Sequence, residues 1–180
     1  MTHRLLLLCL MIQFSSCSIL IPDTRSESTK AGHQLIGNVS RRLYERYGVT
    51  TCAIRESGDK ETYRLIGIGV QLHQVLTKDE ARKLFVECTE YLLKEVNKDP
   101  NFVHYRSVCP FGIKNVDMSL FLSTPDRGSI YYPDVRVVSL MVGDVYFKYS
   151  KDGQLSTFLT EVETYDEAFE KVYGVKRTTH

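Results

Sequence analysis

The chain has 180 residues, with 23 Lys and Arg against 22 Asp and Glu, so its formal net charge is +1. This length is typical of one domain with a core that needs no disulfides. Nucleic-acid binding requires clustered positive charge that displaces counterions from phosphates, and a near-neutral chain offers no such excess. The composition therefore predicts a single domain and excludes nucleic acid as the expected partner.

Residues 1–16 have the three parts of an export signal. A positively charged start that ends at Arg4 is followed by an apolar run from Leu5 to Phe14, and then by the small residues Ser15 and Ser16. A membrane-spanning helix needs about 20 apolar residues, and this run has only about ten. We therefore expect residues 1–16 to be a signal peptide and the protein to be exported.

The tetrad Phe14-Ser15-Ser16-Cys17 resembles the lipobox of bacterial lipoproteins, with Phe14 where most members have an aliphatic residue. The resemblance implies that Cys17 receives a diacylglyceryl group, becomes the mature N-terminus and carries acyl chains such as palmitate. Two or more acyl chains give lasting attachment to a bilayer. The implied location is a bacterial membrane, facing the periplasm or the cell surface. The alternative is an ordinary signal peptide that leaves a soluble secreted protein.

The next segment, residues 17–34, is rich in Ser, Thr and single charges and has no sustained periodicity. This composition is typical of a flexible tether.

Residues 35–47 place Ile36, Val39 and Leu43 at helical spacing, with Gly48 where a helix often ends. The pattern predicts a short amphipathic helix.

Two strand-like runs follow, at 49–57 and 61–73, joined by a polar turn at 58–60. They predict a hairpin in which Cys52 faces the core. The second run is apolar on both faces, which is typical of a strand covered on each side. Gly67 and Gly69 within it indicate close strand packing, since no third glycine or helix start completes a phosphate loop.

The clearest element is a long helix over 77–99, with Thr77 and Glu80 as a capping box. After a loop at 101–115, four extended runs with short connectors predict a meander, and a second capping box at Thr164 and Glu167 begins a short helix. We therefore expect a single α+β domain over 35–174: an antiparallel sheet of about six strands packed against one long helix, with two shorter helices, and a frayed tail at 175–180.

Candidate chemistry is sparse. Cys109 lies in a loop five residues after His104, and a thiolate beside an imidazole is a nucleophile, so a secreted Cys/His-dependent hydrolase or transferase is one alternative. The other interpretation is an ordinary loop cysteine. Cys52, Cys88 and Cys109 are three thiols if Cys17 carries lipid, and an odd number cannot all pair. No spacing of Cys or His indicates a metal site, and no motif indicates a cofactor.

The connector 123–134 is longer than a hairpin needs and carries Tyr131 and Tyr132. These tyrosines are expected either to form a contact surface or to fold back and cap the core. The leading hypothesis is therefore a lipid-anchored envelope protein whose domain binds or scaffolds, without catalysis, with an envelope protein as partner. A freely secreted carrier, holding a small ligand between the long helix and the sheet, is the other alternative to the enzyme.

Overall fold

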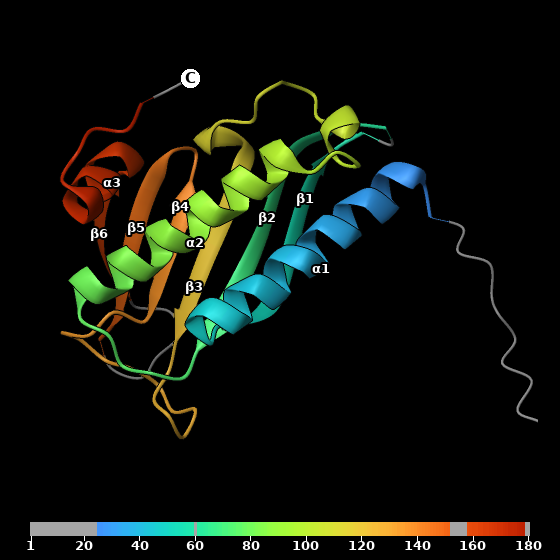
Figure 1. The fold of residues 1–180 in the computed structure, drawn as a ribbon. Helices are drawn as coiled ribbons and strands as arrows, with labels where there is room; N and C mark the ends of the chain where they lie inside the picture. Colours follow the sequence, from blue (N-terminus) through green and yellow to red (C-terminus); the bar gives the residue numbers. More distant parts are fainter. Residues whose placement is uncertain (1–24, 60, 152–157, 179–180) are drawn as a thin grey trace, which may run out of the picture.

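The computed structural model describes residues 25–59, 61–151 and 158–178. They form two layers, a six-stranded sheet with helices packed on one of its faces (Figure 1). The elements in chain order are α1 (Glu27–Tyr47), β1 (Thr50–Gly58), β2 (Tyr63–Leu72), α2 (Lys78–Lys98), β3 (Val116–Leu122), β4 (Val137–Met141), β5 (Asp144–Ser150), β6 (Phe158–Thr164) and α3 (Tyr165–Tyr173). The expected α+β class, with six strands and three α-helices, is confirmed.

The sheet is mixed, which corrects the expectation of a purely antiparallel one. Its strands follow chain order from β1 to β6, and every neighbouring pair is antiparallel except β2 and β3. β2 and β3 are parallel because α2 crosses over the sheet between them and returns the chain to the end where β2 began. The hairpin and the meander therefore join side by side, with α2 as the connection.

The expectation of one long helix and two shorter ones is also wrong, because α1 and α2 have 21 residues each. α1 begins at Glu27, where the Oγ of the N-cap Ser26 accepts a hydrogen bond from the Thr29 amide at 3.2 Å. Residues 27–34, expected to belong to a tether, are thus helical. The extra turns lie against the start of β2, where the Tyr63 hydroxyl donates to the Ser28 carbonyl at 3.3 Å.

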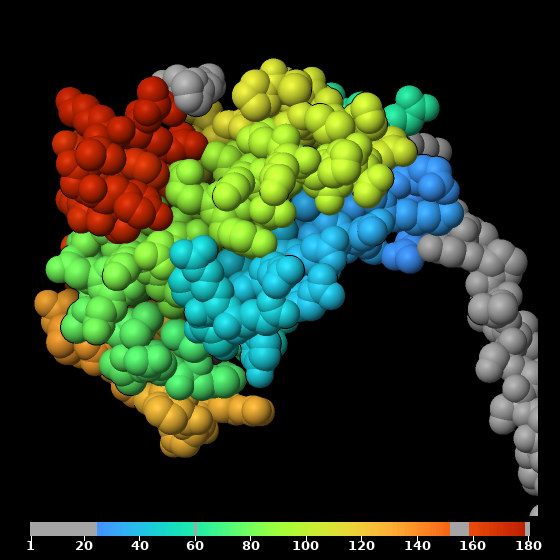
Figure 2. All heavy atoms as spheres, in the orientation of Figure 1, coloured from blue at the N-terminus to red at the C-terminus, as the bar shows by residue number. Residues whose placement is uncertain are grey.

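Both capping boxes are present. Thr77 and Glu80 cap α2, and Thr164 and Glu167 cap α3, each pair exchanging side-chain and backbone hydrogen bonds. α2 lies across the middle of the sheet, and the space between the two layers is filled by fully buried side chains, among them Phe85, Leu92, Met118, Leu120 and Phe147. The helices form a continuous covering from α1 in blue, through α2 in green, to α3 in red (Figure 2).

The second face of the sheet carries no helix among the described residues, yet β2 is an interior strand between β1 and β3 and its residues 66–70 are all buried, as expected for a strand covered on each side. Close packing of strands is confirmed at Gly67, where a Cβ atom would lie 2.4 Å from the carbonyl oxygen of Asp117 on β3. The expectation for Cys52 is wrong: its side chain is exposed instead of in the core, as are those of Ala53 and Ile54 on the same edge strand.

Two expected segments lie partly or wholly outside the described residues. The leader at 1–16 and Cys17 precede them, and of the tail expected at 175–180 only 175–178 are described. No described helix combines the length and apolar character that a bilayer crossing requires.

Candidate functional site

A groove of about 670 Å³ lies along α2. We call it the α2 groove. One wall is the C-terminal half of α2, the second is the loop 110–115, and the third comes from α3 and the segment that follows it. Three stretches far apart in the sequence therefore meet at this site.

The loop wall is held rigidly on α2 by one amide side chain. Asn97 donates from Nδ2 to the Phe111 carbonyl at 2.9 Å, and its Oδ1 accepts the Phe111 amide at 2.8 Å. The same Oδ1 also accepts a hydrogen bond from Arg106 Nη1. At the other end of the loop, Asn115 accepts the Gly112 amide and donates to the Arg64 carbonyl, each at 3.0 Å. The backbone of this wall is thus largely satisfied within the protein.

The floor of the α2 groove is apolar. Leu93 on α2 and Phe111 in the loop are buried, and the Phe111 ring meets that of Phe102 edge to face at 6.5 Å. Ile113 and Phe169 are only partly buried and pack against the core from opposite walls. Apolar surface therefore remains in contact with solvent inside the groove.

The charged groups of the α2 groove are three cations and one carboxylate. Glu90 is already engaged, since its Oε1 accepts a hydrogen bond from Arg177 Nε at 3.0 Å and from the Tyr165 hydroxyl at 3.1 Å. Burial, followed by the charge of Glu90, raises the pKa of Tyr165, so the phenol remains a donor to that carboxylate. Lys94 and Lys114 have no ion-pair partner among the described residues, and the groove therefore carries uncompensated positive charge.

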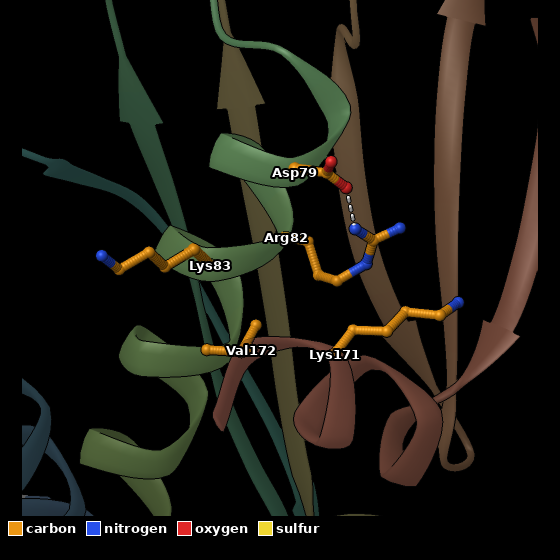
Figure 3. A pocket seen from close by; sticks show the side chains of 5 residues that line it. All are labelled: Asp79, Arg82, Lys83, Lys171 and Val172. Atoms are coloured by element: carbon orange, nitrogen blue, oxygen red, sulfur yellow. Dashed lines mark hydrogen bonds and ion pairs between the residues drawn. The ribbon is translucent and has the colours of Figure 1, made fainter. Parts of the chain in front are cut away.

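A second cavity, of about 540 Å³, lies where α2 meets β6 and α3. Figure 3 shows Arg82 at its centre, joined to Asp79 on the same helix, with Lys171 extending from α3. Arg82 also pairs with Glu163, from Nε to Oε1 at 2.6 Å, and Lys171 Nζ lies 2.6 Å from the second oxygen of that carboxylate. Every carboxylate here is engaged by a cation, which makes the cluster a structural clamp between the three elements.

The same clamp extends along β6. Lys78 donates to Glu161 at 2.5 Å, and its ammonium lies over the Phe147 ring at 4.9 Å from the centroid. Hydrogen bonds from Lys78 and then Tyr149 hold the pKa of Glu161 below its ordinary value. Among the described residues, the carboxylates of this region, Asp79, Glu161 and Glu163, are therefore each paired with a cation.

No hydrogen bond joins His104 to Cys109 among the residues that the structure describes. His104 lines a cavity of about 330 Å³ beside the start of α1 and the β1–β2 turn, and Cys109 is not among the residues that line it. The Cys109 thiol is exposed and its Sγ lies 3.2 Å from Arg106 Nη2, so its neighbour is a permanent cation and not a general base. The catalytic use of Cys109 and His104 stays a prediction.

All three described cysteines are free thiols. Cys88 is buried under α2, and burial raises the pKa of its thiol to about 12. Cys52 and Cys109 are exposed. Within the described residues, no cluster of three or more His, Cys, Asp or Glu side chains is arranged to hold a metal ion.

Different residues of the connector 123–134 fulfil the two roles expected for it, capping the core and forming an exposed contact surface. Ile130 is buried and caps the core, whereas Tyr131 and Tyr132 are 47% and 59% exposed. The backbone amide of Tyr132 donates to the Ser150 carbonyl at 2.9 Å, and its ring meets that of Tyr149 edge to face at 5.8 Å. The loop is thus fixed to β5 while both phenol rings stay accessible.

No protein-family model, no curated protein and no solved structure matches this chain. The candidate site therefore stands on its own geometry. Sequence patterns did not point to Asn97, Lys114 or Arg177, because none belongs to a motif and their neighbours in space are distant in sequence.

Proposed function

We propose that this protein is an exported bacterial lipoprotein, held at a membrane of the cell envelope through lipid on Cys17, whose α+β domain acts by binding. The observation that carries the proposal is the tetrad Phe14-Ser15-Ser16-Cys17 at the end of a short apolar run. Acyl chains on Cys17 would enter the hydrocarbon of the bilayer at about 0.8 kcal/mol per buried CH₂, enough for lasting attachment when two or more are present.

The short link between Cys17 and α1 supports an orientation for the anchored domain. Eight residues, 18–25, separate Cys17 from the N-cap Ser26, and eight residues extend to at most about 29 Å. Ser26 lies beside the β1–β2 turn, where Gly58 and Asp59 line the same cavity. The end of the sheet that carries this turn would therefore face the membrane.

The connector 123–134, which carries the exposed tyrosines, lies at the opposite end of the sheet (Figure 1). β2 runs away from the β1–β2 turn, β3 is parallel to it, and the connector 123–134 follows β3. Tyr131 and Tyr132 would thus point away from the bilayer, where an envelope protein can reach them. Tyrosine offers a large amphipathic contact area at little entropic cost, which suits such a contact.

The test of anchoring is the intact mass of the mature protein in the wild type and in Cys17→Ser. We expect the wild type to be heavier than the polypeptide from Cys17 to His180 by the mass of several acyl chains, and to sediment with membranes. The Cys17→Ser variant should lack that mass and appear in the soluble fraction. An unmodified N-terminus in the wild type, together with a soluble protein, would leave the freely secreted carrier as the better description.

Two alternatives remain as predictions. For the secreted carrier, the ligand was expected to lie between α2 and the sheet, but Phe85, Met118 and Phe147 fill that space. The α2 groove on the outside of the domain is the site available to such a ligand.

For the Cys/His-dependent enzyme, Cys109→Ala should abolish a hydrolase or transferase activity measured with ester and thioester substrates. An activity that survives this substitution excludes the role of Cys109.

A further inference from the structure

The α2 groove combines an apolar floor with unpaired positive charge at its edge. Ile113 and Phe169 supply accessible apolar surface, and Lys94 and Lys114 supply ammonium groups from two different walls. Arg177 adds a guanidinium whose Nε is held by Glu90, which leaves its two terminal nitrogens to other acceptors. A ligand that matches both features has an apolar chain and an anionic head group.

We propose that the α2 groove binds a free fatty carboxylate, with its head group at Lys94, Lys114 and Arg177 and its chain over Ile113 and Phe169. This inference deepens the binding half of the proposed function and rests on it. Charge complementarity selects the sign of the head group, since one carboxylate of the groove is already neutralised and the cations exceed it by two.

The size and the backbone of the groove favour a small molecule over a peptide. Ligand pockets occupy about 300–1,000 Å³, and the α2 groove has about 670 Å³. An extended peptide gains affinity by pairing its main chain with free backbone groups. The loop wall offers few of these, because the Phe111 amide and carbonyl are bonded to Asn97 and the Gly112 amide to Asn115.

The experiment is a calorimetric titration of the full-length chain carrying Cys17→Ser, so that no attached acyl chain competes. The probes are decanoate, octanoate, acetate and decyltrimethylammonium. Decanoate should bind, and octanoate should bind more weakly by about fourfold for each CH₂ removed from an apolar site. Acetate and the cationic amphiphile of equal chain length should not bind measurably. Equal binding of the cation would overturn the proposed charge selection.

The location is tested by a charge-matched pair of double variants. Lys94→Gln with Lys114→Gln should weaken decanoate at least about tenfold, the loss expected for charged contacts worth about 1.4 kcal/mol or more. Lys83→Gln with Lys98→Gln removes the same charge from exposed positions of α2 outside the groove and should change the affinity less than about twofold. Equal loss in both variants, or none in either, would overturn the assignment to this groove.

Two further probes separate other occupants. The first probe is an acidic peptide, and the second is vesicles of anionic phospholipid. If decanoate fails to bind and one of these probes binds with an affinity that falls in the Lys94→Gln with Lys114→Gln variant, the fatty carboxylate is excluded and that probe identifies the occupant. Thermal unfolding followed by circular dichroism checks that each variant is folded. A failure of decanoate to bind leaves the mass measurement on Cys17 unaffected, so the proposed ligand and the proposed lipid anchor are tested independently.

Discussion

Arg82 and Glu163 form an ion pair inside the protein, with Nε and Oε1 2.6 Å apart and their positions 81 residues apart in the sequence. Their side chains are only 8% and 7% exposed. Burial by itself would lower the pKa of Arg82, but the hydrogen bonds that Arg82 donates to Glu163 and Asp79 outweigh it and raise the pKa, so the guanidinium stays charged. The pair joins the first turn of α2 to the end of β6, directly ahead of α3.

Breaking this pair from one side is expected to be costly. Glu163→Ala leaves Arg82 buried with only the exposed Asp79 as partner, and should lower the free energy of unfolding by about 3 kcal/mol. The double variant Arg82→Met with Glu163→Leu removes both charges and should be more stable than Glu163→Ala. Urea unfolding measures both, with Glu170→Ala on the exposed face of α3 as the control. A double variant less stable than Glu163→Ala would contradict this account.

Acid should weaken the contact between α2 and β6 at Glu161. Lys78 and then Tyr149 lower the pKa of this carboxyl from its ordinary value of 4.5, so the folded state binds its proton less tightly than the unfolded state. The stabilisation from this carboxylate is therefore complete above pH 4.5, and it is lost as the pH falls through the lower pKa that Glu161 has in the folded state. Glu161→Gln should cost roughly 0.5 kcal/mol at neutral pH, the size of a screened pair, and progressively less in acid. Melting temperatures between neutral and acidic pH test this, and a difference that grows in acid would contradict the sign.

Two glycines of α1 should respond in opposite directions to alanine. At Gly32 a Cβ atom would lie 2.4 Å from the Tyr63 hydroxyl oxygen, and that buried ring cannot withdraw freely because it bonds the Ser28 carbonyl. Gly32→Ala should cost about 1–3 kcal/mol through overpacking. At Gly37 a Cβ atom would meet no other part of the protein within 4 Å. Alanine at this position should therefore stabilise the helix by about 0.5–1 kcal/mol. Stabilisation by both substitutions would show that residues 27–34 do not pack on β2.

Val142 is strained at the tip of the β4–β5 hairpin. Its φ is 53°, in the left-handed region that disfavours a β-branched residue, and its side chain is 81% exposed. Asn tolerates this conformation in two-residue hairpin turns, so Val142→Asn should raise the free energy of unfolding by about 1 kcal/mol. Val175→Asn, at an exposed valine without positive φ, should be neutral. Urea midpoints compare them, and equal effects would exclude backbone strain as the cause.

Local signals in the sequence located most elements correctly. The α2 helix was expected over 77–99 and is found at Lys78–Lys98, because Thr77 and Glu80 exchange hydrogen bonds within one turn. The start of α3 followed from Thr164 and Glu167 in the same way. The start of α1 was missed because residues 27–34 bury small side chains, including Ala31, which give little hydrophobic periodicity.

For the candidate site, the sequence by itself showed which side chains are available. It showed little about which of them lie close together in the folded protein. It suggested His104 as a partner of Cys109 because the two are close along the chain, whereas the hydrogen-bond partner of the thiol in the fold is Arg106. The exposure of Tyr131 and Tyr132 could be stated only as one of two outcomes, since it depends on how the connector lies against β5.

The sequence alone predicted an export-type leader and a lipobox-like cysteine, and it located three helices and the order of the strands along the chain. Each of these depends on neighbours within a few residues, where capping and periodicity act. Only the tertiary structure decided that β2 and β3 run parallel, that Glu163 neutralises Arg82, and that Arg177 meets Glu90 at the α2 groove. These contacts join residues tens of positions apart, and their energies arise only when burial removes the groups from water.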